Sequence, residues 1–471
     1  MGLAESSGRA ANVTLARLRS ALGQELSASL VVSGDGGYEA ARHVWNAAID
    51  RHPAAILPAA STEAVARAVR AAREASVPIA VRGGGHGTAG FGTIDDGLVI
   101  DLSPMASVAV DPARAIAVAQ GGARLGGFDA ATQAHGLACT MGLVSLTGIG
   151  GLTLGGGVGW LARWMGLACD NLVGATVVGA DGAIRRASSD DDADLLWALR
   201  GGGGNFGIAT EMEFHLRPLG AVTAGVCWFP GSASQAVCRA FRDIAVSAPD
   251  EANVLVTFMT GPDDEAMPEA LRGRLAIMIA ACHVGTPGAN VDRDLEWIRR
   301  LDPIAGSFEP MRYAELQRVF DADFAPGERR YIKGGFTAGI PDGMIEVIDD
   351  WMSRAPSPSA ELDLHQMGGA IARVDEGSTA FADRHSPILF NILTRWTDAG
   401  DDEVHRGWAR GFAAALARFG DGRGYVNFLS EATQESGLQA LYGDVRYERL
   451  RSLKQRYDPD NVFRTNQNIL A

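Results

Sequence analysis

Cysteine is scarce in this chain. The five cysteines are scattered over 471 residues, at positions 139, 169, 227, 238 and 282. No two of them form a CxxC arrangement, so the sequence indicates neither a disulfide framework nor a zinc site, and no bound metal is expected.

Long apolar runs are absent as well. The sequence contains no stretch of 18 apolar residues, so no membrane-spanning helix is expected. The N-terminal segment lacks the basic start and the apolar centre of a signal peptide, which predicts a cytoplasmic location.

Positive charge is in deficit. Lysine and arginine together number 42 against 56 acidic residues, which gives a formal net charge of −14. Nucleic acids and anionic membranes attract basic surfaces, so neither is expected as a partner. The balance carries no information about a neutral small substrate.

Glycine, by contrast, is abundant, with 59 residues and no collagen-like period. The glycines gather in three clusters, at 82–87 (RGGGHG), 148–159 and 201–204. Backbone without side chains can approach a phosphate closely and direct N–H groups at it. Three such clusters predict one long, phosphate-bearing cofactor, of which a dinucleotide is the simplest example.

The hydrophobic pattern places the first cluster in a fold. Short apolar strands are predicted at 54–58, 77–81 and 98–102, with a helix capped by Ser61 or Thr62 between the first two. The glycine–histidine loop then follows the second strand of a β-α-β unit. Further on, residues 208–216 alternate in the manner of a half-buried antiparallel strand.

The pattern of predicted elements and the density of glycine clusters change near residue 218. Beyond it, the pattern predicts helices at 342–354 and 402–418 and strands at 273–282 and 387–396, with fewer glycine clusters. This composition favours a first domain over residues 1–218 and a second, α+β domain with an antiparallel sheet over residues 219–420.

A nicotinamide-binding unit is a competing interpretation. Residues 157–162 fit the pattern G-x-G-x-x-A. That motif needs a strand before it, whereas the preceding residues here are themselves rich in glycine. An NAD(P)-dependent dehydrogenase nevertheless stays open as an alternative.

Six segments together resemble one known family. They are VRGGGHGTAGFGTIDDGLVIDLSPM, GIGGLTLGGGVGWLARWMGLACDN, DADLLWALRGGGGNFGIATEMEF, QMGGAIARVDEGSTAFADR, GYVNFL and YGDVRYERLRSLKQRYDPDNVFRTNQNI. In this order they resemble the berberine-bridge-enzyme-like FAD-linked oxidases of the vanillyl-alcohol-oxidase superfamily. The resemblance implies a PCMH-type FAD-binding domain of two subdomains, to which residues 421–471 return, plus the α+β substrate domain.

The resemblance also implies roles for single residues. His86 would carry the flavin covalently through its 8α-methyl group, and Tyr425 would be the catalytic base. Beside them, the cofactor-binding positions would be Arg82, Gly83, Gly84, Gly85, Gly87, Gly148, Gly150, Gly151, Gly207, Ile208 and Asn427. His365 and Gln366 would contact the substrate, and no acidic residue is expected on the strand that carries them.

Two positions depart from the family pattern. Val144 stands where many members have a cysteine that forms a second bond to the flavin, so the bond through His86 is expected to be the only one. Thr147 stands at the position thought to govern access of oxygen, where valine is common.

The implied activity is oxidation of a CH–OH or CH–NH group of a secondary metabolite, a sugar unit or an alkaloid. Hydride would pass to flavin N5, and dioxygen would reoxidise the flavin to give hydrogen peroxide. The partners are then a small-molecule substrate and dioxygen. A flavin-binding protein without catalytic activity is a further alternative.

Overall fold

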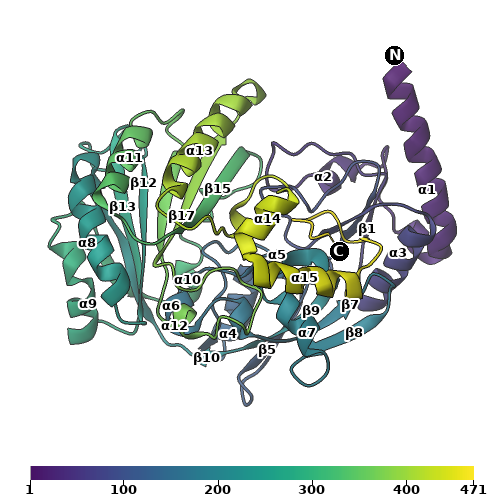
Figure 1. Ribbon diagram of the computed structural model, residues 1–471, viewed down its shortest axis with the longest axis horizontal. Helices are drawn as coiled ribbons and strands as arrows, with labels where there is room; N and C mark the ends of the chain where they lie inside the picture. The colour runs from purple at the N-terminus through teal and green to yellow at the C-terminus, as the bar shows by residue number, and fades with distance from the viewer. Residues whose placement is uncertain (1, 471) are drawn as a thin grey trace.

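The computed structural model describes residues 2–470, with side chains described from residue 13 onward. Figure 1 shows two lobes side by side, with the C-terminal segment lying across the junction between them. Over the described residues, the strands form three sheets and a two-stranded pair, and the largest sheet belongs entirely to the second lobe.

The first lobe begins with a parallel three-stranded sheet in the order β1-β3-β2. Its strands are β1 (Ala55–Pro58), β2 (Ile79–Arg82) and β3 (Leu98–Asp101). Helix α3 (Thr62–Glu74) connects β1 to β2, and the Ser61 side chain caps it by accepting the N–H of Ala64. The predicted β-α-β unit is therefore present, with the glycine–histidine loop directly after β2.

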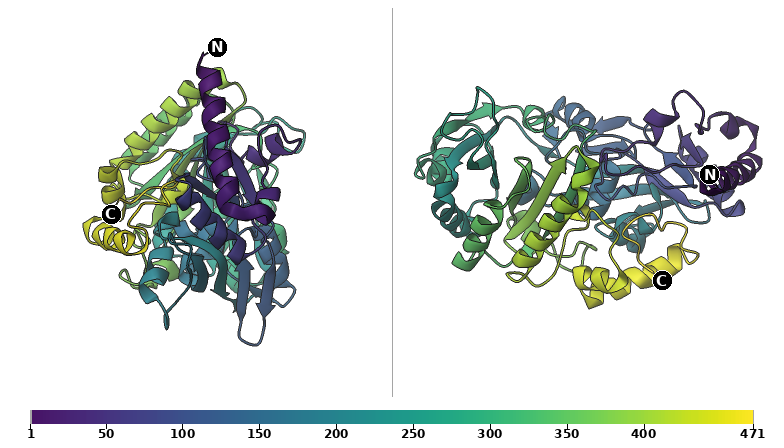
Figure 2. Two further views of the ribbon diagram at one scale, coloured as in Figure 1. Left: turned by 90° about the vertical axis from the view of Figure 1, so that its right-hand side faces the viewer. Right: turned by 90° about the horizontal axis from the view of Figure 1, so that it is seen from above.

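Two helices precede this unit. Helix α1 (Gly2–Ala28) is interrupted at Gly23, where φ is 77°, and it packs against α3. Helix α2 (Tyr38–Arg42) is short. Figure 2 shows that the N-terminal part of α1 projects from the lobe.

The same lobe contains an antiparallel five-stranded sheet in the order β4-β5-β9-β7-β8. The strands are β4 (Val108–Asp111), β5 (Ile116–Gln120), β7 (Leu172–Val178), β8 (Ile184–Ser188) and β9 (Ile208–His215). Its helices are α4 (Leu125–Gln133), α5 (Ile149–Gly155), α6 (Ala162–Met165) and α7 (Ala193–Leu199). Strand β9 alternates as predicted, since Met212 and Phe214 are fully buried and His215 is exposed.

A short pair, β6 (Leu137–Ala138) with β10 (Arg217–Pro218), ends the first lobe. The second lobe is an antiparallel sheet in the order β14-β11-β13-β12-β16-β17-β15. Its strands are β11 (Val222–Pro230), β12 (Ala252–Thr260), β13 (Leu275–Val284), β14 (Ala305–Met311), β15 (Arg329–Thr337), β16 (Ala360–Gln366) and β17 (Ile388–Trp396). The predicted antiparallel sheet of the second domain is thus observed.

Four longer helices cover one face of this sheet (Figures 1 and 2). They are α8 (Ser234–Ser247), α9 (Ala289–Arg299), α11 (Asp342–Met352) and α13 (Asp402–Ala417). Their apolar residues share one core with alternate residues of the strands, for example Leu362 and Leu364 of β16. We call this the outer face. The intervening residues form the inner face, which turns toward the first lobe.

The C-terminal segment contains α14 (Glu435–Tyr442) and α15 (Asp444–Tyr457). Lys454 is fully buried and donates to the carboxylate of Asp458 at 2.7 Å and to the backbone oxygens of Asn205 and Phe463. The Thr465 hydroxyl donates to the carbonyl of Ile79, in β2. The last residues therefore pack on the first lobe, beside the start of the glycine–histidine loop.

Two short helices, α10 (Tyr313–Leu316) and α12 (Ala370–Arg373), complete the fold. Over the described part of the chain, none of the helices is both long enough and apolar enough to span a bilayer. Residues 2–470 also bring together no group of three side chains suited to hold a metal ion.

Candidate flavin site

The glycine–histidine loop is fixed at its start by Arg82. Its guanidinium is buried and binds the Asp101 carboxylate of the neighbouring strand at 2.8 Å and the carbonyl of Ala41 at 2.5 Å. The side chain of Arg82 is thus used to hold the loop on the sheet. Only the backbone of Arg82 is left to contact a cofactor directly.

The first two glycine clusters pack backbone against backbone. A Cβ atom added to Gly84 would come within 2.5 Å of the Cα and the N atom of Gly148, and one added to Gly83 would lie 2.8 Å from the carbonyl oxygen of Gly121. Such distances leave no room for a side chain. By contrast, a Cβ atom on Gly87 or Gly151 would meet nothing within 4 Å. The two clusters therefore form one surface of bare backbone, closed on one side and open at Gly87 and Gly151.

Two further predicted positions lie at the edges of this surface. Gly150 packs 3.2 Å from the carbonyl of Gly121, measured to an added Cβ atom. Gly207 has a φ of 151° and lies against β7, and the side chain of Ile208 is buried in the core of the first lobe. These residues can therefore approach a cofactor with their backbone only.

His86 lies in an aromatic stack that the sequence did not predict. Its ring stacks on Trp45 with the centroids 4.0 Å apart, and the guanidinium of Arg330 lies 4.5 Å from the Trp45 ring. The Trp45 indole donates to the carbonyl of Phe324 at 2.7 Å, which fixes the stack.

The protonation state of His86 follows from this setting. Burial, together with the positive charges of Arg330 and Arg124, lowers the pKa of His86 to about 3. The imidazole is therefore neutral and keeps a lone pair for bond formation. Its Nε2 atom is buried, and no described residue hydrogen-bonds to it. A neutral, orientated imidazole beside an open glycine surface fits the flavin attachment that the sequence implies.

Tyr425 is buried, and its phenolic oxygen accepts hydrogen bonds from three donors. The N–H of Gly157 lies 2.9 Å away, the Asn427 amide 2.8 Å and the N–H of Val158 3.4 Å. We call these three donors the Tyr425 donor cage. Burial raises the pKa of Tyr425 to about 12, and the donor cage opposes that rise, since hydrogen bonds to the oxygen favour the phenolate.

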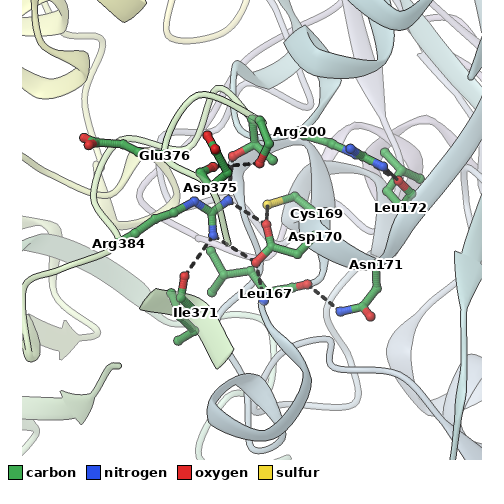
Figure 3. A network of polar contacts seen from close by, with 12 residues as sticks. Leu167, Cys169, Asp170, Asn171, Leu172, Arg200, Ile371, Asp375, Glu376 and Arg384 are labelled. Atoms are coloured by element: carbon green, nitrogen blue, oxygen red, sulfur yellow. Dashed lines mark hydrogen bonds and ion pairs between the residues drawn. The ribbon is translucent and has the colours of Figure 1, made fainter. Parts of the chain in front are cut away.

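The donor cage is held in place by a buried ion pair between the lobes, drawn in Figure 3. Residues Gly156 and Gly157 accept the N–H groups of Cys169 and Ala168 at 2.8 and 3.0 Å. Asp170, which follows Cys169 in the sequence, binds the guanidinium of Arg384 at 2.6 Å, and Arg384 belongs to the second lobe. Both side chains are nearly or completely buried, so the pair fixes the cage relative to the inner face.

This geometry contradicts the nicotinamide alternative. The segment Gly157–Ala162 does not follow a strand, because helix α5 and a glycine turn come before it. Only four residues of helix, α6, come after it. The required strand–turn–helix arrangement is missing, and the backbone amides of residues 157 and 158 point at Tyr425.

The two predicted substrate residues lie on opposite faces of β16. His365 lies on the inner face, 5.6 Å from the ring of Phe428, and burial lowers its pKa to about 4. The Gln366 side chain instead accepts the N–H of Val254 at 3.1 Å and lies 3.5 Å from the carbonyl of Ala245, in α8. The substrate contact predicted for Gln366 is therefore wrong, because successive residues of a strand face opposite ways.

The expectation that this strand carries no acidic residue near the site is also wrong. Asp363 and Glu361 share the inner face with His365, since the three positions are two residues apart on β16. The Asp363 carboxylate accepts the Thr257 hydroxyl at 2.7 Å and the Asn391 amide at 3.3 Å. Burial raises the pKa of both carboxyls, and each remains partly accessible.

The cysteines nearest the glycine clusters are unsuited to a second flavin bond. Cys139 and Cys169 are fully buried, and desolvation raises the pKa of both thiols. Val144, which lies between the two in the sequence, is likewise buried. A thiolate is thus not favoured at either cysteine.

Comparison with known proteins identifies the family of the chain that forms this site. Residues 53–188 match the family described as FAD binding domain, and residues 424–470 match the family described as berberine and berberine like. An uncharacterized FAD-linked oxidoreductase of Bacillus subtilis is 31% identical over 455 residues, which cover 94% of this chain and 97% of that relative.

Several relatives are named for their substrates. The (R)-6-hydroxynicotine oxidase of Paenarthrobacter nicotinovorans is 29% identical over 94% of this chain and 97% of its own length. The glucooligosaccharide oxidase of Sarocladium strictum is 30% identical over 91% of this chain and 89% of its own length.

Solved structures agree with the sequence comparison. The crystal structure of 6-hydroxy-D-nicotine oxidase from Arthrobacter nicotinovorans superposes with a TM-score of 0.83 at 29% identity, covering 93% of this chain and 97% of that one. A glucooligosaccharide oxidase from Acremonium strictum, described with 6-S-cysteinyl, 8α-N1-histidyl FAD, superposes with a TM-score of 0.83 at 25% identity, covering 96% and 99%. The chain is an enzyme with the PCMH-type fold, and it belongs to the berberine-bridge-enzyme-like family of FAD-linked oxidoreductases.

Proposed function

We propose that this enzyme is an oxidase that removes hydride from a carbon bearing a hydroxyl or an amino group in a small substrate. When bound, FAD supplies the hydride acceptor, and dioxygen restores its oxidised form with release of hydrogen peroxide. The observation that carries the proposal is the Tyr425 donor cage. Its hydrogen bonds stabilise the phenolate form of Tyr425, which allows this buried phenol to act as a base beside the open glycine surface.

Tyr425 accepts the proton that the substrate releases. Oxidation of an alcohol releases a proton as well as a hydride, and a side chain at the reacting group must accept it. The donor cage stabilises negative charge on the phenolic oxygen, as an oxyanion hole does for a reacting oxygen. The neutral His365 lies next to Phe428 and bounds the same part of the inner face.

The glycine clusters supply the binding surface for the cofactor. The backbone of residues 83–87, of Gly148, Gly150 and Gly151, and of Gly207 and Ile208 would hold it without side-chain interference. Open space at Gly87 and Gly151 supports this assignment, since a closed surface would leave no room for a ligand.

We further propose that His86 is the only covalent attachment. The neutral imidazole, the valine at position 144 and the buried thiols of Cys139 and Cys169 all support a single bond. The substrate is a hydroxylated or amine-bearing small molecule. This class includes oligosaccharides and 6-hydroxynicotine, the compounds for which the relatives are named.

The proposal is tested by assaying the purified, yellow protein with a panel of substrates. Cellobiose, xylobiose and 6-hydroxynicotine are supplied in turn, and oxygen consumption and peroxide are followed together. Oxidase activity gives equal amounts of peroxide and oxygen consumed. Turnover that requires an artificial electron acceptor and yields no peroxide contradicts the oxidase assignment. A polypeptide that precipitates colourless from acid contradicts the covalent bond.

A further inference from the structure

The short segment that follows helix α2 binds the glycine–histidine loop on both sides of His86. The backbone N–H of Trp45 donates to the carbonyl of Gly85 at 3.1 Å. The side-chain amide of Asn46 donates to the carbonyl of Thr88 at 2.8 Å. Between these two anchors, the imidazole of His86 stacks on the Trp45 ring at 4.0 Å, with 17° between the planes. One short segment therefore determines both where this imidazole lies and how it is orientated.

The second lobe holds Trp45 and Asn46 in turn. The Asn46 amide also donates to the carbonyl of Arg330 at 2.9 Å, and its oxygen accepts the N–H of the same residue at 2.8 Å. The Arg330 guanidinium lies 4.5 Å from the Trp45 ring. The Trp45 indole donates to the carbonyl of Phe324 at 2.7 Å. These contacts come from β15 and from the segment before it, so Trp45 and Asn46 connect the His86 loop to the second lobe.

The side chain of Arg330 is itself fixed. It is fully buried, binds the Glu328 carboxylate at 2.6 Å and donates to the carbonyls of Asp323 and Ala325, both at 3.0 Å. A cation that lies over an indole is attracted by the π electrons of the ring. The second lobe therefore sets the position of the Trp45 ring, and the ring sets the position of the imidazole stacked on it.

We propose that Trp45 and Asn46 are positioning residues for flavin attachment, which fix the imidazole of His86 for bond formation once the second lobe has packed on the first. The inference rests on the covalent attachment proposed above and specifies what controls it. Both side chains are buried, 6% and 2% exposed, and their polar contacts are with the loop and the second lobe. Their effect on the cofactor therefore acts through His86.

The attachment step depends strongly on orientation. The imidazole loses its N–H hydrogen, the 8α-methyl group of the flavin loses one hydrogen, and a carbon–nitrogen bond forms between them. The two hydrogens and the two electrons released leave with dioxygen as hydrogen peroxide. When two partners react while bound, a small misplacement of one of them slows the reaction greatly. Attachment is therefore expected in the assembled protein, where the ring is held, and not before the lobes have joined.

The first experiment follows attachment over time. Apoprotein of the full chain, made in riboflavin-starved cells, is mixed with saturating FAD in air at about pH 8, where an imidazole of ordinary pKa is already neutral. Flavin that is bound is measured after gel filtration, and flavin that is attached after acid precipitation. Trp45→Leu and Asn46→Ala are expected to bind FAD but to attach it at least about tenfold more slowly than the wild type. Trp45→Phe keeps an aromatic face and is expected to retain most of the rate.

Trp408→Leu is the matched control. Trp408 is buried to a similar degree and also donates its indole N–H to a backbone carbonyl, that of Trp351, but it lies in the helical core of the outer face. This variant is expected to lose stability and to attach FAD at the wild-type rate. Equal slowing in Trp408→Leu overturns the inference, and so do wild-type rates in both Trp45→Leu and Asn46→Ala. Loss of FAD binding in these two variants also overturns it, since a positioning residue leaves binding in place.

The second experiment tests whether the second lobe acts through Trp45. Arg330→Met removes the cation from the Trp45 ring and is expected to slow attachment. The double variant with Trp45→Leu is expected to be no slower than Trp45→Leu alone, because the two changes remove one interaction. Rate losses that multiply in the double variant contradict the connection to the second lobe.

This inference and the proposed function fail in different ways. Wild-type protein that binds FAD and never attaches it contradicts the covalent bond, and the inference with it. Wild-type protein that attaches FAD, with Trp45 and Asn46 variants that do so equally fast, contradicts only the positioning role. Attachment controlled by Trp45 and Asn46 in a protein that forms no peroxide from any substrate retains the positioning role and contradicts the oxidase assignment.

Discussion

The N–H of Gly157 donates to the phenolic oxygen of Tyr425 over 2.9 Å, although 268 residues separate them in the chain. This hydrogen bond joins the second glycine cluster, in the first lobe, to the segment that follows the second lobe. The site therefore exists only when both lobes and the C-terminal segment are assembled.

Replacing Tyr425 by phenylalanine removes the proposed base and leaves its ring in place. General base catalysis is worth roughly 100- to 10,000-fold, and kcat is expected to fall by that factor while flavin content is retained. Steady-state kinetics on the best substrate of the panel measure the loss. Tyr447→Phe is the matched control, since that hydroxyl is buried without a partner among the described side chains. Full activity of Tyr425→Phe would falsify the assignment.

Replacing Asn427 by alanine removes one donor of the cage. A hydrogen bond to the phenolate lowers the pKa of Tyr425, so losing it raises that pKa further. The limb of kcat/KM that rises with pH is expected to move to higher pH by about one unit, which corresponds to about 1.4 kcal/mol. A pH–rate profile of the variant beside the wild type gives the shift. An unshifted limb with reduced kcat contradicts this role for the cage.

Breaking the Asp170–Arg384 pair is expected to destabilise the fold. Removing one partner leaves the other charged and buried, which costs about 3–5 kcal/mol, so Arg384→Met lowers the free energy of unfolding by that amount. The double variant with Asp170→Asn is expected to lose less than the sum of the single losses, because the two changes remove one interaction. Denaturant unfolding measures both.

The exposed pair Asp350–Arg354 is the control for that experiment. Both of its side chains are more than half exposed, and Asp350→Asn is expected to change the free energy of unfolding by less than about 0.5 kcal/mol. Equal losses in the two pairs would contradict the structural role of the buried one.

Replacing His86 by alanine is expected to abolish the covalent bond. The acid-precipitated polypeptide should then be colourless, whereas wild-type polypeptide stays yellow. His135→Ala, on an exposed turn after α4, should keep the colour. Colour that persists in His86→Ala would place the attachment elsewhere.

The sequence predicted the parts of the site that a local pattern can carry. The residues themselves indicated the glycine clusters and the strand before Arg82, and the family resemblance indicated the tyrosine motif at 425–427. The face of β16 was predicted wrongly at Gln366, because a shift of one residue in a strand reverses the side on which a side chain lies. Glu361 and Asp363 were missed for a related reason, since the recognisable segment begins only at residue 366.

Other parts of the site could not be predicted locally. Trp45 and Arg330 make a stack with His86 from three distant segments, and no spacing within any one of them indicates the others. The amides of residues 157 and 158 belong to a pattern that resembles a nucleotide-binding motif, and only the tertiary contact with Tyr425 shows their role. Such residues become visible only once the chain is folded.

Two glycines of the second cluster should respond in opposite ways to alanine. At Gly148 a Cβ atom would overlap the backbone of Gly84, so Gly148→Ala is expected to destabilise the protein by a few kcal/mol, on the order of other overpacked sites. At Gly151, within α5, a Cβ atom meets nothing within 4 Å, and alanine favours a helix over glycine by about 0.5–1 kcal/mol. The apoprotein of Gly151→Ala should therefore be at least as stable as the wild type.

The same methyl group would occupy the space assigned to the cofactor. Gly151→Ala is thus expected to bind FAD at least tenfold more weakly while its apoprotein melts no lower, a combination that general destabilisation cannot produce. Thermal unfolding of the apoprotein and titration with FAD, both in a His86→Ala background in which no covalent attachment is expected, give the two quantities. Unchanged FAD affinity would show that the open surface at Gly151 does not face the cofactor, and the path proposed along the glycine clusters would then have to exclude this residue.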